Sequence, residues 1–255
     1  MFFLKKIKYF GFGVKCPLCN SMIRNYLPLD KKYSIDIAIN GIIYGVNDYE
    51  TLNTKNFMCP VCGADDRTRL YVLYLKEKLK ESNKTNKIFQ LLHFAPERPL
   101  QQILKKYQFI KYRSADLYMN EVDDKVDITN MNIYADNTFD IIICSHVLEH
   151  IIDVNKAISE LYRIMKHGSW AIIMAPVLPE LPEDYENETI VSPEDRLKFF
   201  GQDDHVRVFS KKGFVNKLKN NGFIVNDLGI EYFGKDSFVK YNITSKSVLY
   251  IIEKT

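Results

Sequence analysis

Blocks of apolar and polar positions follow one another from about residue 88 to the end of the chain. Short apolar runs predict β-strands at 88–94, 110–115, 125–128, 140–144, 170–175, 223–225 and 247–252. Apolar side chains spaced i, i+3, i+4, i+7 predict helices at 100–107 and 154–165, and a further helix is expected at 210–222. Strands that alternate with helices predict an α/β domain with a mostly parallel sheet.

Residues that begin and end helices support this division. Asp153 and Ser210 stand where N-caps are expected, and Pro99 fits the first turn of a helix. Gly168 is expected to end the helix at 154–165 in a left-handed conformation.

The first quarter of the chain follows a different pattern. It contains two paired cysteines, Cys16-Pro-Leu-Cys19 and Cys59-Pro-Val-Cys62. Each C-x-x-C turn brings two sulfurs to one ion, so two turns can complete a tetrahedral Cys₄ zinc shell. Two disulfides are an alternative, as is a thioredoxin-like redox pair, although that motif requires one C-x-x-C in a βαβ context. We expect a structural zinc, because a closed shell leaves no position for catalysis.

These patterns predict two parts. Residues 1–64 are expected to form an N-terminal tail and a zinc-ribbon-like module with small strands at 33–39 and 42–44, followed by a helix at 65–82. Residues 65–255 are expected to form the larger domain. Lysines interrupt the apolar first ten residues, so these predict a short helix or tail packed on the protein and no membrane span.

Composition narrows the class of protein. The 255 residues are 46% hydrophobic and 26% charged, as in an ordinary soluble globule. The net charge of +3, without a block of five like charges, gives little support for a large nucleic-acid footprint. Cys144 stands alone in an apolar run and is expected to be a buried thiol. Four cysteines on a metal and one single cysteine favour a reducing compartment, and hence the cytoplasm.

The predicted strand ends carry the chemistry. The first strand ends in His93-Phe-Ala-Pro-Glu97 and the second in Asp116, about 20 residues later, which is the spacing between a cofactor loop and an acid that accepts ribose hydroxyls. The glycine-rich turn that serves pyrophosphate is missing. This pattern therefore favours a nucleoside cofactor without phosphates over NAD.

Several spaced motifs resemble a known family. Three segments stand out: Asp127-Ile-Thr-Asn-Met, Asp136-Asn-Thr-Phe-Asp-Ile-Ile-Ile-Cys-Ser-His-Val-Leu-Glu-His-Ile and Leu161-Tyr-Arg-Ile-Met-Lys-His-Gly-Ser-Trp. With them, the chain resembles class I S-adenosylmethionine-dependent methyltransferases of the type 11 kind over roughly residues 85–225. Two further segments resemble a subgroup of this family that has an N-terminal zinc-ribbon-like element. They are Arg67-Thr-Arg69, which follows a Cys-Pro-x-Cys-Gly element, and Phe200-Gly-Gln-Asp-Asp-His-Val-Arg207. The resemblance implies a Rossmann-like seven-stranded sheet flanked by helices, with S-adenosylmethionine as cofactor.

The resemblance also implies roles for residues at the strand ends. The loop with His93, Phe94, Ala95 and Glu97 is expected to pass under the methionine part of the cofactor. The ribose and adenine are expected to contact Asp116, Leu117, Asp127 and Ile128. Ser145 and His146 are expected to face the methionine and sulfonium region. Asp116 and Asp127 could instead only cap strand ends. His146 and His150 are four residues apart, as in a metal pair, but Glu149 is misplaced for a metalloprotease base, and this segment binds no metal in the resembling family. His150 is therefore interpreted as structural.

The resemblance places the methyl acceptor beside an insertion at about 178–207, over the active site. His205, beside Asp204, is the first candidate for a general base and His146 the second. The candidates for binding the acceptor are Arg67, Arg69, Tyr185 and Arg207. A hydrogen bond from the loop to the domain for His205 and structural ion pairs for the arginines are the alternatives.

The sequence thus predicts methyl transfer to a small polar acceptor, most simply an oxygen of a sugar, a phosphate or a related metabolite. A role in cell-surface glycan modification follows by analogy only. The chain has Cys-Ser-His-Val in place of the Asn/Asp-Pro-Pro-Tyr/Phe of many amino-group methyltransferases. One alternative is a methyltransferase of ribosomal or transfer RNA that grips RNA with the zinc module, although a nucleic-acid partner is not expected from the charge. Another is a zinc-ribbon binding protein without catalysis.

Overall fold

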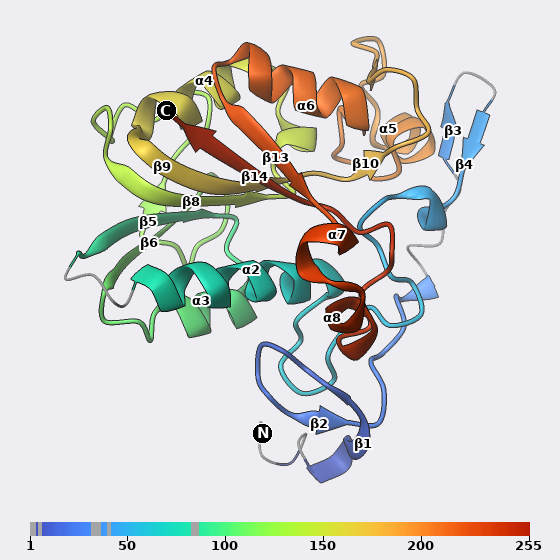
Figure 1. Cartoon of the computed structure of the whole chain (residues 1–255). Helices are drawn as coiled ribbons and strands as arrows, with labels where there is room; N and C mark the ends of the chain where they lie inside the picture. Colours follow the sequence, from blue (N-terminus) through green and yellow to red (C-terminus); the bar gives the residue numbers. More distant parts are fainter. Residues whose placement is uncertain (1–3, 5–6, 32–36, 40–41, 83–86) are drawn as a thin grey trace.

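A seven-stranded sheet forms the centre of the computed structural model, which describes residues 4, 7–31, 37–39, 42–82 and 87–255 (Figure 1). The strand order is β13-β14-β9-β8-β5-β6-β7. The strands are β5 (Phe89–Phe94), β6 (Ile110–Asp116), β7 (Asp124–Lys125), β8 (Phe139–Ser145), β9 (Met165–Met174), β13 (Ile224–Leu228) and β14 (Leu249–Lys254). β5 to β9 are parallel and β14 is antiparallel to both neighbours. This sheet confirms the predicted Rossmann-like α/β fold.

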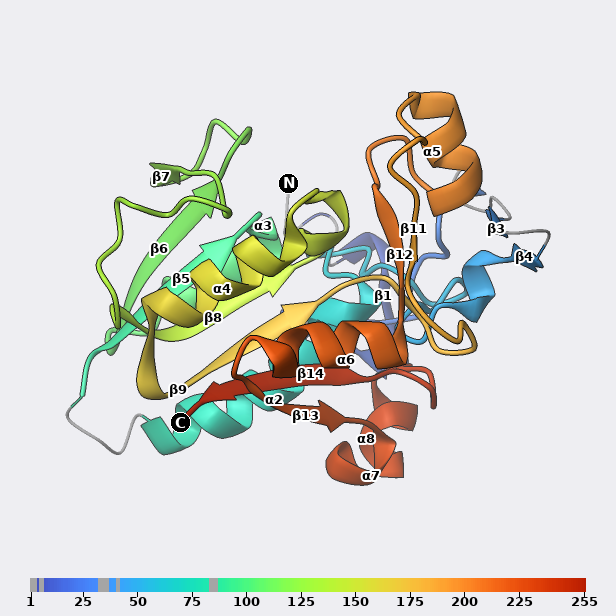
Figure 2. The same cartoon turned by 90° about the horizontal axis from the view of Figure 1, so that it is seen from above.

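Helices cover both faces of the sheet (Figures 1 and 2). α2 (Asp66–Ser82) and α3 (Arg98–Leu104) lie on one face, whereas α4 (Val154–Ile164) and α6 (Lys211–Asn220) lie on the other. The Asp153 carboxylate accepts a hydrogen bond from the Lys156 amide, and the Ser210 hydroxyl accepts one from the Gly213 amide, as expected of N-caps. All seven residues of β8 are buried, because helices cover both sides of this central parallel strand.

Some predicted boundaries are wrong. α4 ends at Ile164 and the chain enters β9 directly, so Gly168 is not a helix C-cap. Its φ of 72° lies within β9, in the part of the strand where the register with β8 shifts. The third strand is shorter than predicted and ends before Asp127, whose carboxylate accepts hydrogen bonds from Thr129 and bends the chain. Two short helices were not predicted, α7 (Ile230–Phe233) and α8 (Lys235–Lys240).

The insertion between β9 and α6 is an ordered lobe. It contains β10 (Val177–Leu178), β11 (Tyr185–Glu186), α5 (Pro193–Phe200) and β12 (Arg207–Ser210), whose strands form a second sheet in the order β10-β12-β11. A separate apolar cluster holds it together, made of Tyr44, Leu178, Leu181, Ile190, Phe200 and Val208. α5 also contacts the N-terminal hairpin of β3 (Ile37–Ile39) and β4 (Ile42–Tyr44), which lies beside it in Figure 2.

The N-terminal cysteine-containing region, with β1 (Phe10–Lys15) and β2 (Met22–Ile23), shares the main core. Leu18, Tyr26 and Val61 belong to the same hydrophobic cluster as the sheet. The predictions for the first ten residues and for the strand at 33–39 concern in part residues 1–3, 5–6 and 33–36, which lie outside the described residues. No helix in the described part of the chain is long and apolar enough to cross a membrane.

Candidate active site

A cavity of about 450 Å³ lies at the carboxyl ends of β5, β6 and β8. The chain passes from β5 outwards to β6 and β7 and then from β8 outwards in the opposite direction, so the strand order reverses between β5 and β8. A crevice opens at such a point in an open parallel sheet. This strand-end cavity is lined by Phe94, Ala95, Asp116, Leu117, Tyr118, Val126, Asp127, Ile128, His146, Val147, His150, Ile151, Arg196 and Asp204.

Two carboxylates of the strand-end cavity are held in the same way. Asp116 Oδ1 accepts hydrogen bonds from the amides of Tyr118 and Met119, both at 2.7 Å. Asp127 Oδ1 accepts hydrogen bonds from the amide and hydroxyl of Thr129, both at 2.8 Å. In each case the local turn fixes one oxygen, and the other makes no hydrogen bond to any described residue. Each carboxylate is therefore oriented by the chain and keeps one oxygen for a ligand.

The backbone approaches the strand-end cavity in an unusual conformation at two positions. Ala95, after β5, has a φ of 44°, and His146, after β8, has a φ of 55°. Non-glycine residues rarely adopt this left-handed region, which costs on the order of 1 kcal/mol or more. The Ala95 amide donates to Ala115 O and the His146 amide donates to Met174 O, so neighbouring strands hold both turns. The first-strand loop thus keeps a tight turn without glycine.

A second cavity, of about 400 Å³, lies behind the first and shares His146 and His150 with it. The chain segments that surround it come from the N-terminal region and from the middle of the larger domain. This module-side cavity is lined by Leu29, Val46, Tyr49, Thr51, Leu52, Phe57, Arg67, His146, Glu149, His150, Ala175, Pro176, Val177, Gly201, Gln202 and His205. Two adjoining cavities with shared histidines can hold two reactants on either side of the shared wall.

Charged groups converge on the shared wall. Glu149 is 1% exposed, and the His146 Nδ1 atom lies 3.3 Å from its Oε1 atom. Burial tends to raise the pKa of Glu149, but its contact with His146 and its proximity to His205 and His150 outweigh burial and lower the pKa to about 2. Burial lowers the pKa of His205, so its ring is neutral near pH 7 and can accept a proton.

The family described as Methyltransferase domain (type 11) matches residues 106–173. The match extends from before β6 into β9 and contains most residues of the strand-end cavity, among them Asp116, Asp127 and His146. Over these residues the chain is similar to a methyltransferase domain. The seven-stranded central sheet and this match both agree with the Rossmann-like methyltransferase fold that the sequence motifs predicted.

Several solved structures are similar to the chain at low identity. The cyclase SpnF is 13% identical with a TM-score of 0.44, over 74% of this chain and 82% of its own. The CurJ carbon methyltransferase is 11% identical with a TM-score of 0.47, over 72% and 55%. A methyltransferase from Archaeoglobus fulgidus is 16% identical with a TM-score of 0.42, over 70% and 91%. Similarities of this size say nothing about the acceptor. No curated protein matches the chain.

Most of the residues expected to contact the cofactor line the strand-end cavity, but three lie behind it. His93 is fully buried between the Tyr112 hydroxyl at 3.1 Å and Glu97 at 2.8 Å. The contacts of Glu97 with His93 and Arg67 outweigh its burial and lower its pKa to about 2. Ser145 exchanges a hydrogen bond of 2.9 Å with the Tyr71 hydroxyl. These side chains support the cavity floor.

Of the four residues expected to bind the acceptor, Arg67 alone lines the module-side cavity. Arg69 is fully buried; it stacks on Tyr26 and donates to three backbone carbonyls. Arg207 is buried and donates to the carbonyls of Leu148, Ile151 and Ile152. Tyr185 packs on Phe200 within the insertion lobe. Those three side chains are occupied by the protein itself.

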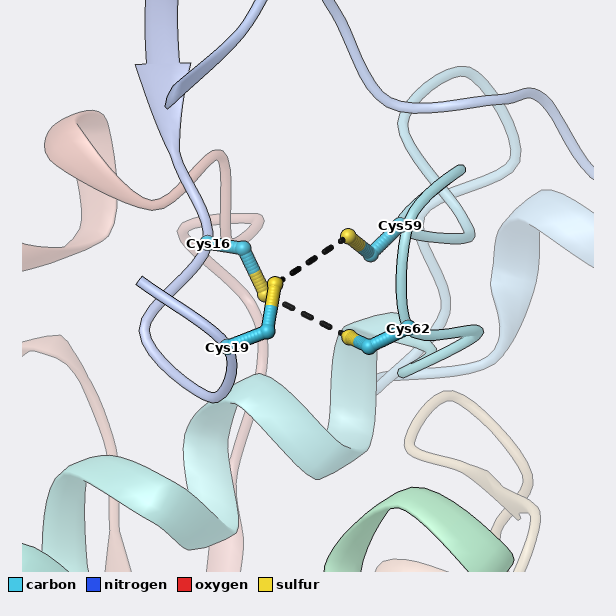
Figure 3. Close-up of side chains that lie close together, drawn as sticks. All are labelled: Cys16, Cys19, Cys59 and Cys62. Atoms are coloured by element: carbon cyan, nitrogen blue, oxygen red, sulfur yellow. Dashed lines mark hydrogen bonds between the residues drawn. The ribbon is translucent and has the colours of Figure 1, made fainter. Parts of the chain in front are cut away.

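The four paired cysteines lie together, as Figure 3 shows. Cys16 Sγ is 3.8 Å from Cys62 Sγ, and Cys19 Sγ is 3.9 Å from Cys59 Sγ. Four sulfurs about 2.3 Å from a central zinc ion would stand about 3.8 Å apart at the corners of a tetrahedron. A disulfide would require a separation of about 2.05 Å, so neither pair is bonded. The donor set and spacing fit zinc.

The two cysteine turns have the same backbone geometry. The Asn20 amide donates to Cys16 O and the Gly63 amide donates to Cys59 O. Asn20 has a φ of 57° and Gly63 a φ of 80°, so the fourth residue after each leading cysteine is left-handed. The amide of each leading cysteine also donates a hydrogen bond across its turn, from Cys16 to Ser21 O and from Cys59 to Ala64 O. Two matching knuckles therefore face one another.

Sequence reasoning missed several residues of the two cavities. Tyr49, Glu149, His150, Arg196 and Gln202 line one or both, and no role in binding was assigned to them. Glu149 offered one signal, its position four residues after the end of the central strand β8. Tyr49 and Gln202 offered none, because only the tertiary fold brings their segments to the carboxyl edge of the sheet.

Proposed function

We propose that the chain transfers a methyl group from S-adenosylmethionine to an oxygen of a small polar acceptor, such as a sugar, a phosphate or a related metabolite. One observation carries the proposal: the strand-end and module-side cavities adjoin at His146 and His150. A cofactor in the first and an acceptor in the second would meet at these histidines. The module-side cavity, of about 400 Å³, is of the size that suits a small molecule.

Asp116 and Asp127 would hold the nucleoside part of the cofactor. Each has one oxygen fixed by its own turn and one without a partner among the described residues. We assign Asp116 to the ribose diol and Asp127 to the adenine amino group, with Leu117 and Ile128 against the ring. The cofactor supplies a methyl carbon on a cationic sulfur.

The acceptor would be deprotonated by a histidine. When the acceptor oxygen forms its bond to the methyl carbon, the bond from that carbon to sulfur breaks and the hydroxyl proton leaves to a base. His146 and His205 both line the module-side cavity, and burial keeps His205 neutral. Arg67 would bind an anionic group of the acceptor, because its side chain lines the same cavity.

Residues 1–64 would serve as a zinc-ribbon-like module and 65–255 as the methyltransferase domain. We assign zinc to Cys16, Cys19, Cys59 and Cys62, whose spacing fits it. The module would also form part of the wall of the acceptor's cavity, because Leu29, Tyr49 and Phe57 line the module-side cavity. Five unpaired cysteines favour a cytoplasmic location.

The cofactor assignment is tested by calorimetric titration with S-adenosylmethionine and S-adenosylhomocysteine. Asp116→Asn keeps an oxygen to accept the Tyr118 and Met119 amides but removes the negative charge. We expect it to weaken binding about tenfold to a hundredfold, since a hydrogen bond to a charged group contributes roughly 1.5–3 kcal/mol. Asp136→Asn, an exposed aspartate paired with Arg163, is the matched control and should bind as the wild type does.

The acceptor assignment is tested by measuring S-adenosylhomocysteine release with sugars, sugar phosphates, phenolic compounds and unmodified ribosomal and transfer RNA. Turnover with a small hydroxyl compound that His146→Ala removes would support the proposal. Turnover with RNA alone would replace it by an RNA methyltransferase. A folded protein that binds neither form of the cofactor would be a binding protein, and the enzymatic assignment would be abandoned.

A further inference from the structure

Glu149 is a buried carboxylate without a hydrogen bond to the rest of the described chain. Its side chain is 1% exposed, and neither Oε1 nor Oε2 has a hydrogen-bond partner. His146 Nδ1 lies 3.3 Å from Oε1 but makes no hydrogen bond to it. A buried carboxylate in this state is costly unless a cation or donor completes it. The site therefore calls for a positively charged ligand.

Two imidazoles present free nitrogens beside this carboxylate. His205 is 3% exposed; its Nδ1 atom is hydrogen-bonded to Phe200 O at 3.2 Å, and its buried Nε2 atom has no partner. His150 Nδ1 lies 3.3 Å from Asp204 Oδ2, and its Nε2 atom lies 4.0 Å from Glu149 Oε1. Metal-binding histidines are commonly fixed in this way, with one ring nitrogen on a carbonyl or carboxylate and the other left for the metal.

We propose that Glu149, His150 and His205 bind a divalent metal ion at the wall of the module-side cavity. One ligand atom from each residue lies within 4.8 Å of the others, so small side-chain rotations would bring all three to about 2.0–2.2 Å from one ion. Two imidazoles and a carboxylate suit divalent first-row transition ions, including manganese, iron, cobalt and zinc. This centre is separate from the four cysteines, whose sulfur ligands form a closed set.

The surrounding fold holds the three ligands in place. Glu149 and His150 lie in the short helix η3 (Leu148–His150), and Arg207 donates hydrogen bonds to the carbonyls of Leu148, Ile151 and Ile152 on either side of them. The Val206 amide donates to Glu149 O, which ties η3 to the segment that carries His205. Two segments more than fifty residues apart in the sequence are thus joined by Arg207 and Val206 to form one centre.

The ion would also select the acceptor, an inference that rests on the proposed methyl transfer. All three ligands line the module-side cavity, and three protein ligands leave coordination positions open towards it. An acceptor with two adjacent oxygen atoms, such as a vicinal diol, could fill two of them. The ion would lower the pKa of a bound hydroxyl, and His146, which is not among the three ligands, would be left to accept its proton.

The test uses protein whose cysteine site is loaded with zinc, titrated with Mn²⁺ while electron paramagnetic resonance measures free Mn²⁺. Mn²⁺ prefers oxygen and imidazole ligands to thiolates, so it should not displace that zinc. We expect one Mn²⁺ per chain, with nitrogen couplings from two imidazoles. Glu149→Gln, His150→Gln and His205→Gln should each weaken binding by at least about tenfold, and Asp204→Asn by roughly tenfold.

Glu121→Gln and His167→Gln are the matched controls, since both side chains are exposed and distant from the site. Circular dichroism checks that each variant is folded, and His150, which is partly exposed, can be replaced even if Glu149→Gln does not fold. The proposal is overturned if the wild type binds no Mn²⁺ or Co²⁺ beyond the cysteine site, or if the ligand variants bind as the controls do. Mn²⁺ binding without cofactor binding would support the metal site and reject the methyltransferase mechanism. Cofactor binding without Mn²⁺ binding would support the methyltransferase mechanism and reject the metal site.

Discussion

At the scale of single residues, Glu50 couples stability to pH. It is 3% exposed, and the Tyr250 hydroxyl donates a hydrogen bond to it. Burial, partly offset by that hydrogen bond, raises the pKa of Glu50 to about 7 from an ordinary 4.5. The folded state therefore binds the proton more tightly than the unfolded state does. The contribution of Glu50 to stability is present below pH 4.5 and is lost as the pH rises through 7.

We expect Glu50→Gln to remove this loss. The glutamine keeps an oxygen for the Tyr250 hydroxyl but carries no charge at any pH. Relative to the wild type, the variant should gain about 2 kcal/mol in free energy of unfolding between pH 5 and pH 7.5. Urea denaturation at the two pH values measures the gain, and the exposed Glu121→Gln is the control. An equal difference between variant and wild type at both pH values would contradict the assignment.

Asp116 and Asp127, the acids proposed to bind the cofactor, illustrate what could be predicted from single residues. Asp116 was predicted because an acid at the end of a parallel strand points to the crevice. Asp127 was predicted from the family resemblance of its segment. Arg69 and Arg207 could not be judged in this way. Their guanidinium groups donate to carbonyls of segments far away in the sequence, and no local pattern distinguishes such an arginine from one that binds an acceptor.

At the scale of elements, the two cysteine knuckles should control the stability of the N-terminal region. Leu18 and Tyr26 share the core of the sheet, and Arg69 of α2 stacks on the Tyr26 ring at 3.9 Å. Removing zinc would leave four thiols crowded together without an ion to hold the knuckles. We expect the free energy of unfolding to fall by on the order of 5 kcal/mol or more, and the melting temperature by more than about 10 °C.

Mercurial titration of the thiols, with a zinc indicator and a thermal melt, measures this effect. Zinc released by the mercurial comes from cysteine, which separates it from metal held by Glu149, His150 and His205. Cys59→Ser should lose the releasable zinc. Cys144→Ser should keep it, because Cys144 lies fully buried in β8, away from the knuckles. A wild-type protein that melts at the same temperature after zinc removal would refute a structural role.

Long helices and strands could be predicted from the sequence, whereas very short ones could not. The central strand β8 has an apolar run from Ile141 to Cys144 and α4 has a complete apolar stripe, so these patterns identified both elements. β10 and β11 have two residues each, which is too short for any period to register. α5 was missed although Ser192 caps it and Pro193 begins it, because its apolar residues follow no stripe over eight residues.

At the scale of the whole molecule, the two cavities differ in how far the sequence could predict them. The strand-end cavity follows from the strand order, since its residues stand at the ends of consecutive strands. The module-side cavity brings Leu29 and residues 46–57 against 146–150, 175–177 and 201–205. Only the packed fold joins these segments, through the contact of α5 with β3 and through Glu50 with Tyr250. Binding of the cofactor and of the acceptor should therefore be separable by substitution.

Filling one cavity at a time tests this separation. Leu52→Trp adds bulk to the module-side cavity, whereas Ile128→Trp adds it to the strand-end cavity. We expect Leu52→Trp to bind S-adenosylhomocysteine within about twofold of the wild type but to lose methyl transfer, because the acceptor's space is filled. Ile128→Trp should lose cofactor affinity by at least about tenfold, since the indole would occupy space next to the adenine. Calorimetry and thermal melts on both variants separate lost binding from lost folding, and equal loss of cofactor affinity in the two folded variants would show that the cavities act as one site.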